Sequence, residues 1–90
     1  MSEFRFAVNV LPKDGILDPQ GRAVEGSLGH LGVEGVSAVH VGRRIELTVE
    51  APTEVDARAT VERLARELFS NPLIESFAVE WVDIHAGAAR

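Results

Sequence analysis

Residues 4–10 read FRFAVNV, and this stretch decides the class of fold. Its apolar side chains stand at every second position, which is the period of a β-strand with one buried face. The same alternation returns in residues 39–41, 45–49 and 77–81. We therefore predict four strands, with a hairpin across residues 42–43 joining the second strand to the third.

Two helices are predicted between these strands, because their apolar residues recur with the spacing of an amphipathic helix. The first runs from Pro19 to about Leu31 after Asp18, and the second follows Thr53; aspartate and threonine are both favoured N-caps. The apolar stripes are Val24, Leu28 and Leu31 in the first helix, and Ala57, Val61, Leu64, Ala65 and Leu68 in the second.

The resulting order, β-α-β-β-α-β, predicts an α+β fold: one mainly antiparallel four-stranded sheet with both helices on one face, ferredoxin-like by default. Residues 1–82 form a single domain in this prediction, and residues 83–90 a flexible tail. The side chains expected to face the helices are Phe4, Phe6, Val8, Val10, Val39, Val41, Ile45, Leu47, Val49, Phe77, Val79 and Trp81.

The opposite face of the sheet carries polar and small side chains in this register. They are Arg5, Ala7, Asn9, Ala38, His40, Glu46, Thr48, Ser76, Ala78 and Glu80. A solvated face is one interpretation, and a dimer contact in which a second sheet packs closely is the other.

Gly21 is an unexpected residue in the first turn of a helix, where it costs about 1 kcal/mol relative to alanine. One explanation is close packing within the chain. The other is that a neighbouring subunit's backbone approaches the start of the helix. The residues alone leave both explanations open.

Size and composition narrow the function. A chain of 90 residues buries only about 60 to 65% of its unfolded surface, so its own core is marginal. A net charge of −5 disfavours nucleic acid and anionic membranes as partners. The absence of cysteine, of a signal peptide and of a long apolar run predicts a cytoplasmic protein.

The sequence contains no recognisable catalytic or metal-binding motif. His30, His40 and His85 fall on different segments without ligand-like spacing, and no nucleophile elbow is present. We therefore predict no catalytic residue and no metal site on this chain.

Three segments resemble the PurS family, the small subunit of phosphoribosylformylglycinamidine synthase. They are LDPQG at 17–21, VGR followed by IEL at 41–47, and LFSNPLIESF at 68–77. The resemblance extends from Phe4 to about Trp81. Arg43 stands where the family typically has lysine, which keeps the charge and changes its shape.

The resemblance implies a non-catalytic role in de novo purine biosynthesis. The complete enzyme converts formylglycinamide ribonucleotide (FGAR), ATP and glutamine to formylglycinamidine ribonucleotide (FGAM). A large synthetase subunit uses ATP and Mg²⁺, a glutaminase subunit releases ammonia, and the small subunit joins the two and supports ammonia transfer. The family also forms dimers or dimers of dimers, and no cofactor is expected on the small subunit.

We expect two turns and two arginines to contact neighbouring subunits. The interface residues predicted in this way are Asp18, Pro19, Gln20, Gly21, Arg43, Arg44, Asn71, Pro72, Ile74 and Glu75. In this hypothesis Gly21 keeps the approach of a neighbour unobstructed, and the arginines meet an acidic surface.

Two other functions share this element order. A small-ligand-binding regulatory module of the amino-acid-sensing type is the main alternative. An enzyme of the acylphosphatase type is the third, and the absence of a glycine-rich arginine loop argues against it.

Overall fold

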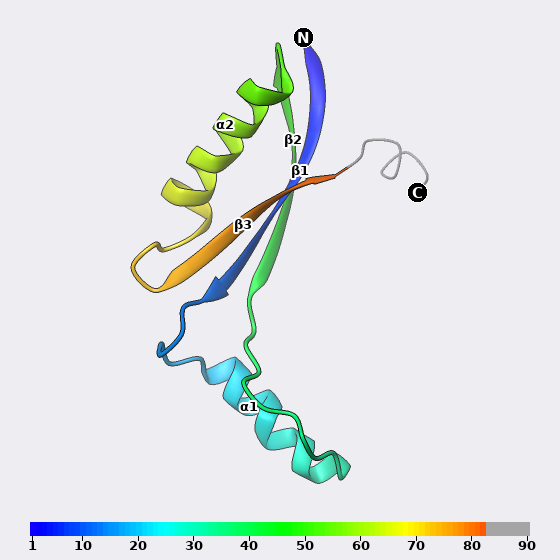
Figure 1. The fold of residues 1–90 in the computed structure, drawn as a ribbon, viewed down its shortest axis with the longest axis vertical. Coiled ribbons are helices and arrows are strands. Elements are labelled where there is room, and N and C mark those ends of the chain that lie inside the picture. Colours follow the sequence, from blue (N-terminus) through cyan, green and yellow to red (C-terminus); the bar gives the residue numbers. More distant parts are fainter. Residues whose placement is uncertain (83–90) are drawn as a thin grey trace.

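The computed structural model describes residues 1–82, which form one antiparallel sheet of three strands and two helical segments (Figure 1). The strands are β1 (Ser2–Pro12), β2 (Arg43–Ala51) and β3 (Glu75–Val82), in the order β2-β1-β3. The helices are α1 (Pro19–Leu28), which ends in a 3₁₀ turn (Gly29–Leu31), and α2 (Glu54–Leu64), which continues into a π-helical turn (Ala65–Phe69).

β1 is the central strand and pairs along both edges. Its partners run from Ser2↔Ala51 to Val10↔Arg43 on β2, and from Arg5↔Val82 to Pro12↔Glu75 on β3. Because side chains alternate between the faces of a sheet, this register puts the apolar residues of all three strands on one side. The predicted α+β class and antiparallel sheet are confirmed.

α2 covers that apolar face and closes the core. Phe6, Val8 and Val10 of β1 are buried with Val61 and with the small residues Ala57 and Ala65 of the helical segment. Thr53 caps α2 as predicted, since its hydroxyl oxygen accepts a hydrogen bond from the Asp56 amide at 3.2 Å. Side chains that pack around this core are Phe4, Ile45, Leu47, Val49, Phe69, Phe77 and Val79.

The predicted strand at residues 39–41 and its hairpin are wrong. Ala38 has a left-handed φ of 56°, which a strand does not accommodate, and the amide of Val39 bonds to a side chain of α1. At Gly42 the backbone already lies close against β1, where a Cβ would collide with the Val10 carbonyl oxygen. The chain therefore runs into β2 without reversing direction, and the sheet has three strands.

The prediction that both helices cover one face of the sheet is also wrong. Figure 1 shows α1 leading away from the end of the sheet, with only α2 lying across it. Leu31 of the predicted apolar stripe is 74% exposed, and Val24 is exposed as well. The radius of gyration is 16.7 Å, against about 12 Å for a compact domain of this length.

The apolar stripe of the second helix shifts by one residue at its end. Leu68, predicted to be inside, is exposed, and Phe69 packs against the core instead. The cause is the π-helical turn, whose wider i→i+5 spacing rotates the side chains that follow. Trp81 pairs with Phe6 and so lies on the predicted face of the sheet, but it is exposed.

The uncovered face of the sheet is closed by its own polar side chains. Arg44 of β2 donates to Glu80 of β3 at 3.0 Å and to Asn9 of β1 at 3.2 Å, and it also pairs with Glu46. Ala7 lies between these long side chains and is fully buried. Close packing of a second sheet on this face would displace a bonded network, which favours the solvated interpretation.

The C-terminal prediction falls outside the described residues. The tail at 83–90 and His85 lie there, so their predicted character is not tested. Within residues 1–82, no helix is long and apolar enough to cross a membrane.

Because the core is small, the loss of two buried methyl groups should measurably lower the free energy of unfolding. Val61→Ala should destabilise the chain by about 2 kcal/mol, since it removes two buried methyl groups beneath the sheet. Val55→Ala is the matched control on the same helix, because Val55 is 72% exposed, and we expect a change within about 0.5 kcal/mol. Urea unfolding measures both, and equal losses would contradict the packing described.

Candidate functional site

One end of the sheet brings the segment that leads into α1 close to the second predicted interface segment, residues 71–75. β1 ends there, and β2 and β3 both begin there, so the chain after Pro12 and the chain before Glu75 leave the sheet at the same edge. The Lys13 amide donates to the Ile74 carbonyl at 2.8 Å, and its ammonium donates to the Pro72 carbonyl at 2.6 Å. The sequence hypothesis made residues 18–21 and 71–75 two turns that contact a neighbouring subunit. The contact within the chain joins the second turn to Lys13, which precedes the first.

Asp18 organises the start of α1. Its Oδ1 accepts from the Gly21 amide at 3.0 Å, which makes it the predicted N-cap, and Pro19 occupies the first turn. Its Oδ2 accepts from the Val41 amide at 3.1 Å and lies 3.4 Å from His40 Nδ1. Asp18 is the buried polar residue of residues 1–82, with 7% of its surface exposed.

The hydrogen bonds of Asp18 favour its ionised form. The Gly21 amide lowers the pKa of the carboxyl most, the Val41 amide and His40 lower it further, and burial opposes them. A carboxyl with a depressed pKa stabilises the fold above its unfolded pKa and loses that effect as the pH falls.

Gly21 is explained by the chain itself. A Cβ at this position would collide with the Val39 carbonyl oxygen and lie 2.5 Å from Asp18 Oδ2. Gly21 is also buried, so the hypothesis that it keeps open the approach of a neighbouring subunit is wrong. The close approach is intramolecular: residues 39–41 return past the first turn of the helix.

The second segment is a hydrogen-bonded turn after the π-helical turn. The carbonyl of Asn71 accepts from the amides of Ile74 at 3.0 Å and Glu75 at 2.7 Å, and its side chain accepts from the Leu73 amide at 3.2 Å. Pro72 lies inside the turn. The backbone is thus satisfied internally, which leaves Leu73 on the outside with 84% of its surface exposed.

Arg43 ties this turn to the sheet. Its two terminal nitrogens bind Glu75 in a bidentate pair at 2.8 and 2.9 Å, and Nη2 also donates to the Phe69 carbonyl at 2.6 Å. Arginine suits this position because a planar guanidinium can hold a carboxylate with two parallel bonds, which a lysine ammonium cannot. Arg43, together with the Asn71 amide, lowers the pKa of Glu75 to about 2.

Both predicted arginines are therefore occupied within the chain. Arg43 binds Glu75, and Arg44 belongs to the network on the uncovered face with Asn9, Glu46 and Glu80. Their contact with an acidic partner stays a prediction, and such a partner would have to compete with these carboxylates.

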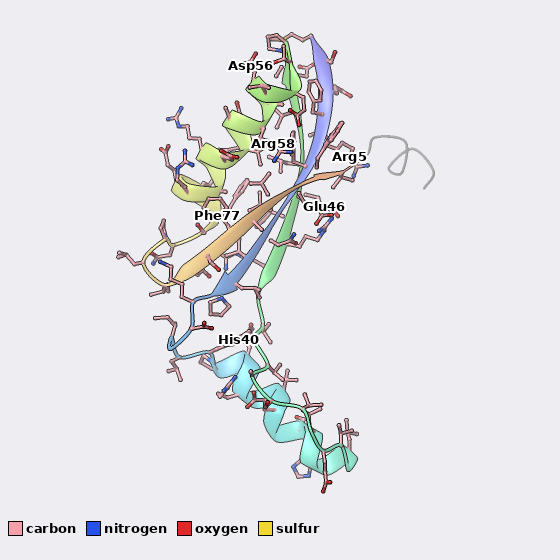
Figure 2. All side chains as sticks on the ribbon, viewed as in Figure 1. Arg5, His40, Glu46, Asp56, Arg58 and Phe77 are labelled. Carbon is pink, nitrogen blue, oxygen red and sulfur yellow. The ribbon has the colours of Figure 1, made fainter. Side chains whose placement is uncertain are left out.

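Sequence reasoning missed three residues at the junction between α1 and the sheet. Arg22 and Glu25 bond to the backbone of Val39, and His40 lies beside Asp18, where Figure 2 shows it between the sheet and α1. The spacing of positions 18, 22 and 25 could have indicated a polar face on the helix. An open hollow of ≈ 400 Å³ lies alongside, lined by Gly15, Ile16, Leu17, Asp18, Arg22 and His40.

The residues of this junction connect backbone segments to one another. The Asp18 carboxylate accepts hydrogen bonds from two backbone amides. Among the described residues, His40 lies beside Asp18, and no serine or threonine hydroxyl is hydrogen-bonded to it. Within residues 1–82 no three His, Asp or Glu side chains cluster in a way that could hold a metal ion. The arrangement orients backbone segments and presents exposed apolar side chains around them.

Comparison with known proteins gives a consistent family match. The model of the PurS family, described as phosphoribosylformylglycinamidine (FGAM) synthase, matches residues 5–83. The PurS subunit of FGAM synthase from Synechocystis is 40% identical over 73 residues, covering 81% of this chain and 73% of the relative. The subunit from Mycobacterium leprae is 37% identical, covering 83% and 91%.

Solved structures agree. The PurS subunit from Thermotoga maritima superposes with a TM-score of 0.82 at 30% identity, covering 90% of this chain and 93% of that one. A chain in the structure of PurLQS from the same organism also gives a TM-score of 0.82 at 30% identity, with coverage of 91% and 100%.

The intramolecular role of Gly21 can be tested against a second glycine in α1. Gly21→Ala should destabilise the chain by about 1 to 3 kcal/mol, because the added methyl group meets backbone. Gly26→Ala is the control, since nothing lies within 4 Å of its Cβ position, and it should stabilise the chain by up to about 1 kcal/mol. Urea unfolding at neutral pH measures both. An unchanged stability for Gly21→Ala would contradict the close approach.

The Arg43–Glu75 pair predicts a pH dependence. The pKa of Glu75 is lowered from 4.5 to about 2, so its ionised form stabilises the fold above pH 4.5 and loses that effect as the pH falls toward 2. Glu75→Gln should therefore lower the Tm most above about pH 5, with the gap to the parent chain closing on acidification. Thermal melts across this range measure the gap.

Glu67→Gln is the control for that series. Glu67 pairs with Arg63 at 2.9 Å on the exposed side of the helical segment, where an ion pair contributes little. A Tm gap for Glu75→Gln that stays constant across the pH range would show that the ion pair is not its cause.

Proposed function

This chain belongs to the PurS family of phosphoribosylformylglycinamidine synthase subunits, and we propose that it acts by assembly. In this proposal it joins a large ATP-dependent synthetase subunit to a glutaminase subunit and supports the passage of ammonia between them. The product of the complex is FGAM, formed from FGAR, ATP and glutamine. The chain itself makes no bond to substrate.

The observation that carries the proposal is the exposed helix α1. Val24 and Leu31 belong to its apolar stripe, yet no sheet of the same chain lies beneath the helix (Figure 1). A lone amphipathic helix of this length is only marginally stable in water and gains most from tertiary packing. The apolar side of α1 is therefore suited to another polypeptide.

A second copy of the chain is the partner proposed for α1. The core contains only small or medium side chains apart from Phe6, and Ile45, Leu47 and Val49 of β2 remain partly exposed. A helix supplied by another copy would bury more apolar surface on both partners. Dimers, or dimers of dimers, follow from repeating that contact.

The synthetase and glutaminase are proposed to meet the end of the sheet where Lys13 contacts the turn at residues 71–75. Leu17 and Leu73 are 81% and 84% exposed there, and Ile74 is exposed beside them. The hydrogen-bonded turns hold these side chains outward on ordered backbone, which lowers the entropic cost of binding. The solved PurLQS of T. maritima supports the idea that a PurS subunit assembles with others.

The cofactors are assigned to the partners in this proposal. ATP and Mg²⁺ act on the synthetase subunit, and no cofactor is assigned to residues of this chain. The complex is proposed to work in the cytoplasm.

Reconstitution tests the assembly role. The chain alone should show no turnover, whereas adding it to the synthetase and glutaminase subunits should raise glutamine-dependent FGAM formation by at least about tenfold. Free ammonia bypasses transfer between subunits, so ammonia-dependent formation by the synthetase should change little when the chain is added. The readout is FGAM produced with each nitrogen source, together with co-elution in size-exclusion chromatography.

Two outcomes would contradict the proposal. One is a chain that binds neither subunit under conditions where both are active. The other is a marked rise in Tm of the isolated chain with an amino acid or nucleotide, which would favour the ligand-binding regulatory module.

A further inference from the structure

The N-cap residue of α1 and two side chains of the helix hold a returning stretch of backbone. The Val39 amide donates to Glu25 Oε2 at 2.7 Å, and the Val39 carbonyl accepts from Arg22 Nη2 at 2.7 Å. The Val41 amide donates to Asp18 Oδ2 at 3.1 Å. We name Asp18, Arg22 and Glu25 the α1 clasp.

The clasp lies on a single face of the helix. Positions 18, 22 and 25 are four and three residues apart, which places them one above another. Gly21 falls on the same face and leaves room for the Val39 carbonyl. The apolar residues Val24, Leu28 and Leu31 repeat the same spacing on a face turned by about 120°.

Packing on the sheet cannot set the direction of α1, because the sheet does not lie beneath it (Figure 1). The segments that connect α1 to β1 and β2, residues 13–18 and 32–42, contain no strand and no α-helix. Their backbone turns allow many directions for the helix. The side-chain bonds of the clasp remove that freedom by fixing α1 to the backbone that leads into β2.

Two of the clasp residues form an ion pair. Arg22 and Glu25 pair with each other at 3.2 Å while each bonds to Val39, and Asp18 lies beside His40. Hydrogen bonds to charged groups are stronger than those between neutral groups. The clasp thus combines three charge-assisted bonds over the three residues 39–41.

We propose that the α1 clasp is a positioning device: it sets the direction in which α1 leaves the sheet and turns the apolar stripe outward. The consequence for binding rests on the proposed assembly function. The direction of the helix is a property of this chain and can be measured without partners.

Spin-label distances test the proposal. The chain has no cysteine, so Ser27→Cys on α1 and Thr48→Cys on β2 give one labelled pair; both positions are exposed. Labelled chains are diluted with unlabelled chains, so that distances within one chain dominate. Arg22→Ala/Glu25→Ala keeps the net charge and the helix propensity while removing both bonds to Val39, and it should widen the distance distribution at least about twofold.

Arg63→Ala/Glu67→Ala is the matched control. It also removes one exposed ion pair, and that pair spans a single helical segment. Its distance distribution should match that of the parent chain. Glu25→Gln provides a second check, because its amide oxygen can still accept from Val39, and the distribution should stay narrow. A narrow distribution in Arg22→Ala/Glu25→Ala, with helicity retained by circular dichroism, would overturn the proposal.

Binding separates this inference from the proposed function. If the parent chain assembles, Arg22→Ala/Glu25→Ala should weaken its apparent Kd for the complex about tenfold, because fewer molecules hold α1 in the competent direction. Widened distances with an unchanged Kd would overturn the link between the clasp and assembly. Failure of the parent chain to assemble would overturn the proposed function and leave the distance result standing.

Discussion

The hydrogen bonding of β1 along both edges is the constraint on which the rest of the subunit depends. β1 contributes Phe6, Val8 and Val10 to the core, three of the four largest side chains that are fully buried in residues 1–82. α2 supplies the fourth, Val61, and lies across the same face. With β2 and β3 on its two edges, β1 has no edge left for residues 39–41, whose backbone groups bond to side chains of α1 and its N-cap instead.

α1 and α2 therefore turn opposite kinds of side chain toward the rest of the chain. α2 turns its apolar residues toward the sheet, and its exposed side carries ion pairs such as Arg63–Glu67. α1 turns polar residues toward its own chain, and its apolar stripe faces outward. A helix arranged in this way contributes little to the stability of a single copy and much to a contact between polypeptides, which agrees with membership of a family of enzyme subunits.

The sequence predicted what depends on local patterns. Alternation located β1, β2 and β3, and Asp18 and Thr53 were recognised as caps because capping needs only a side chain near its own backbone. Long-range geometry was not predictable in this way. Val39 and Val41 alternate like strand residues, yet the left-handed Ala38 and the bonds to Arg22 and Glu25 keep them out of the sheet. The predicted interface residues stay a prediction, and the backbone that approaches Gly21 belongs to the chain itself. No local pattern distinguishes a neighbouring backbone from a returning one.

The principal extents are 52 × 34 × 15 Å, and the shortest of them leaves room for little more than one helix upon one sheet. In a molecule this thin most side chains lie at least partly at the surface, and few positions are constrained by folding alone. In such a chain, contacts with other subunits should limit which substitutions are accepted at many of the remaining positions. Compensating changes should therefore accumulate in pairs across subunit boundaries, so that the sequences of co-inherited subunits record one another's history.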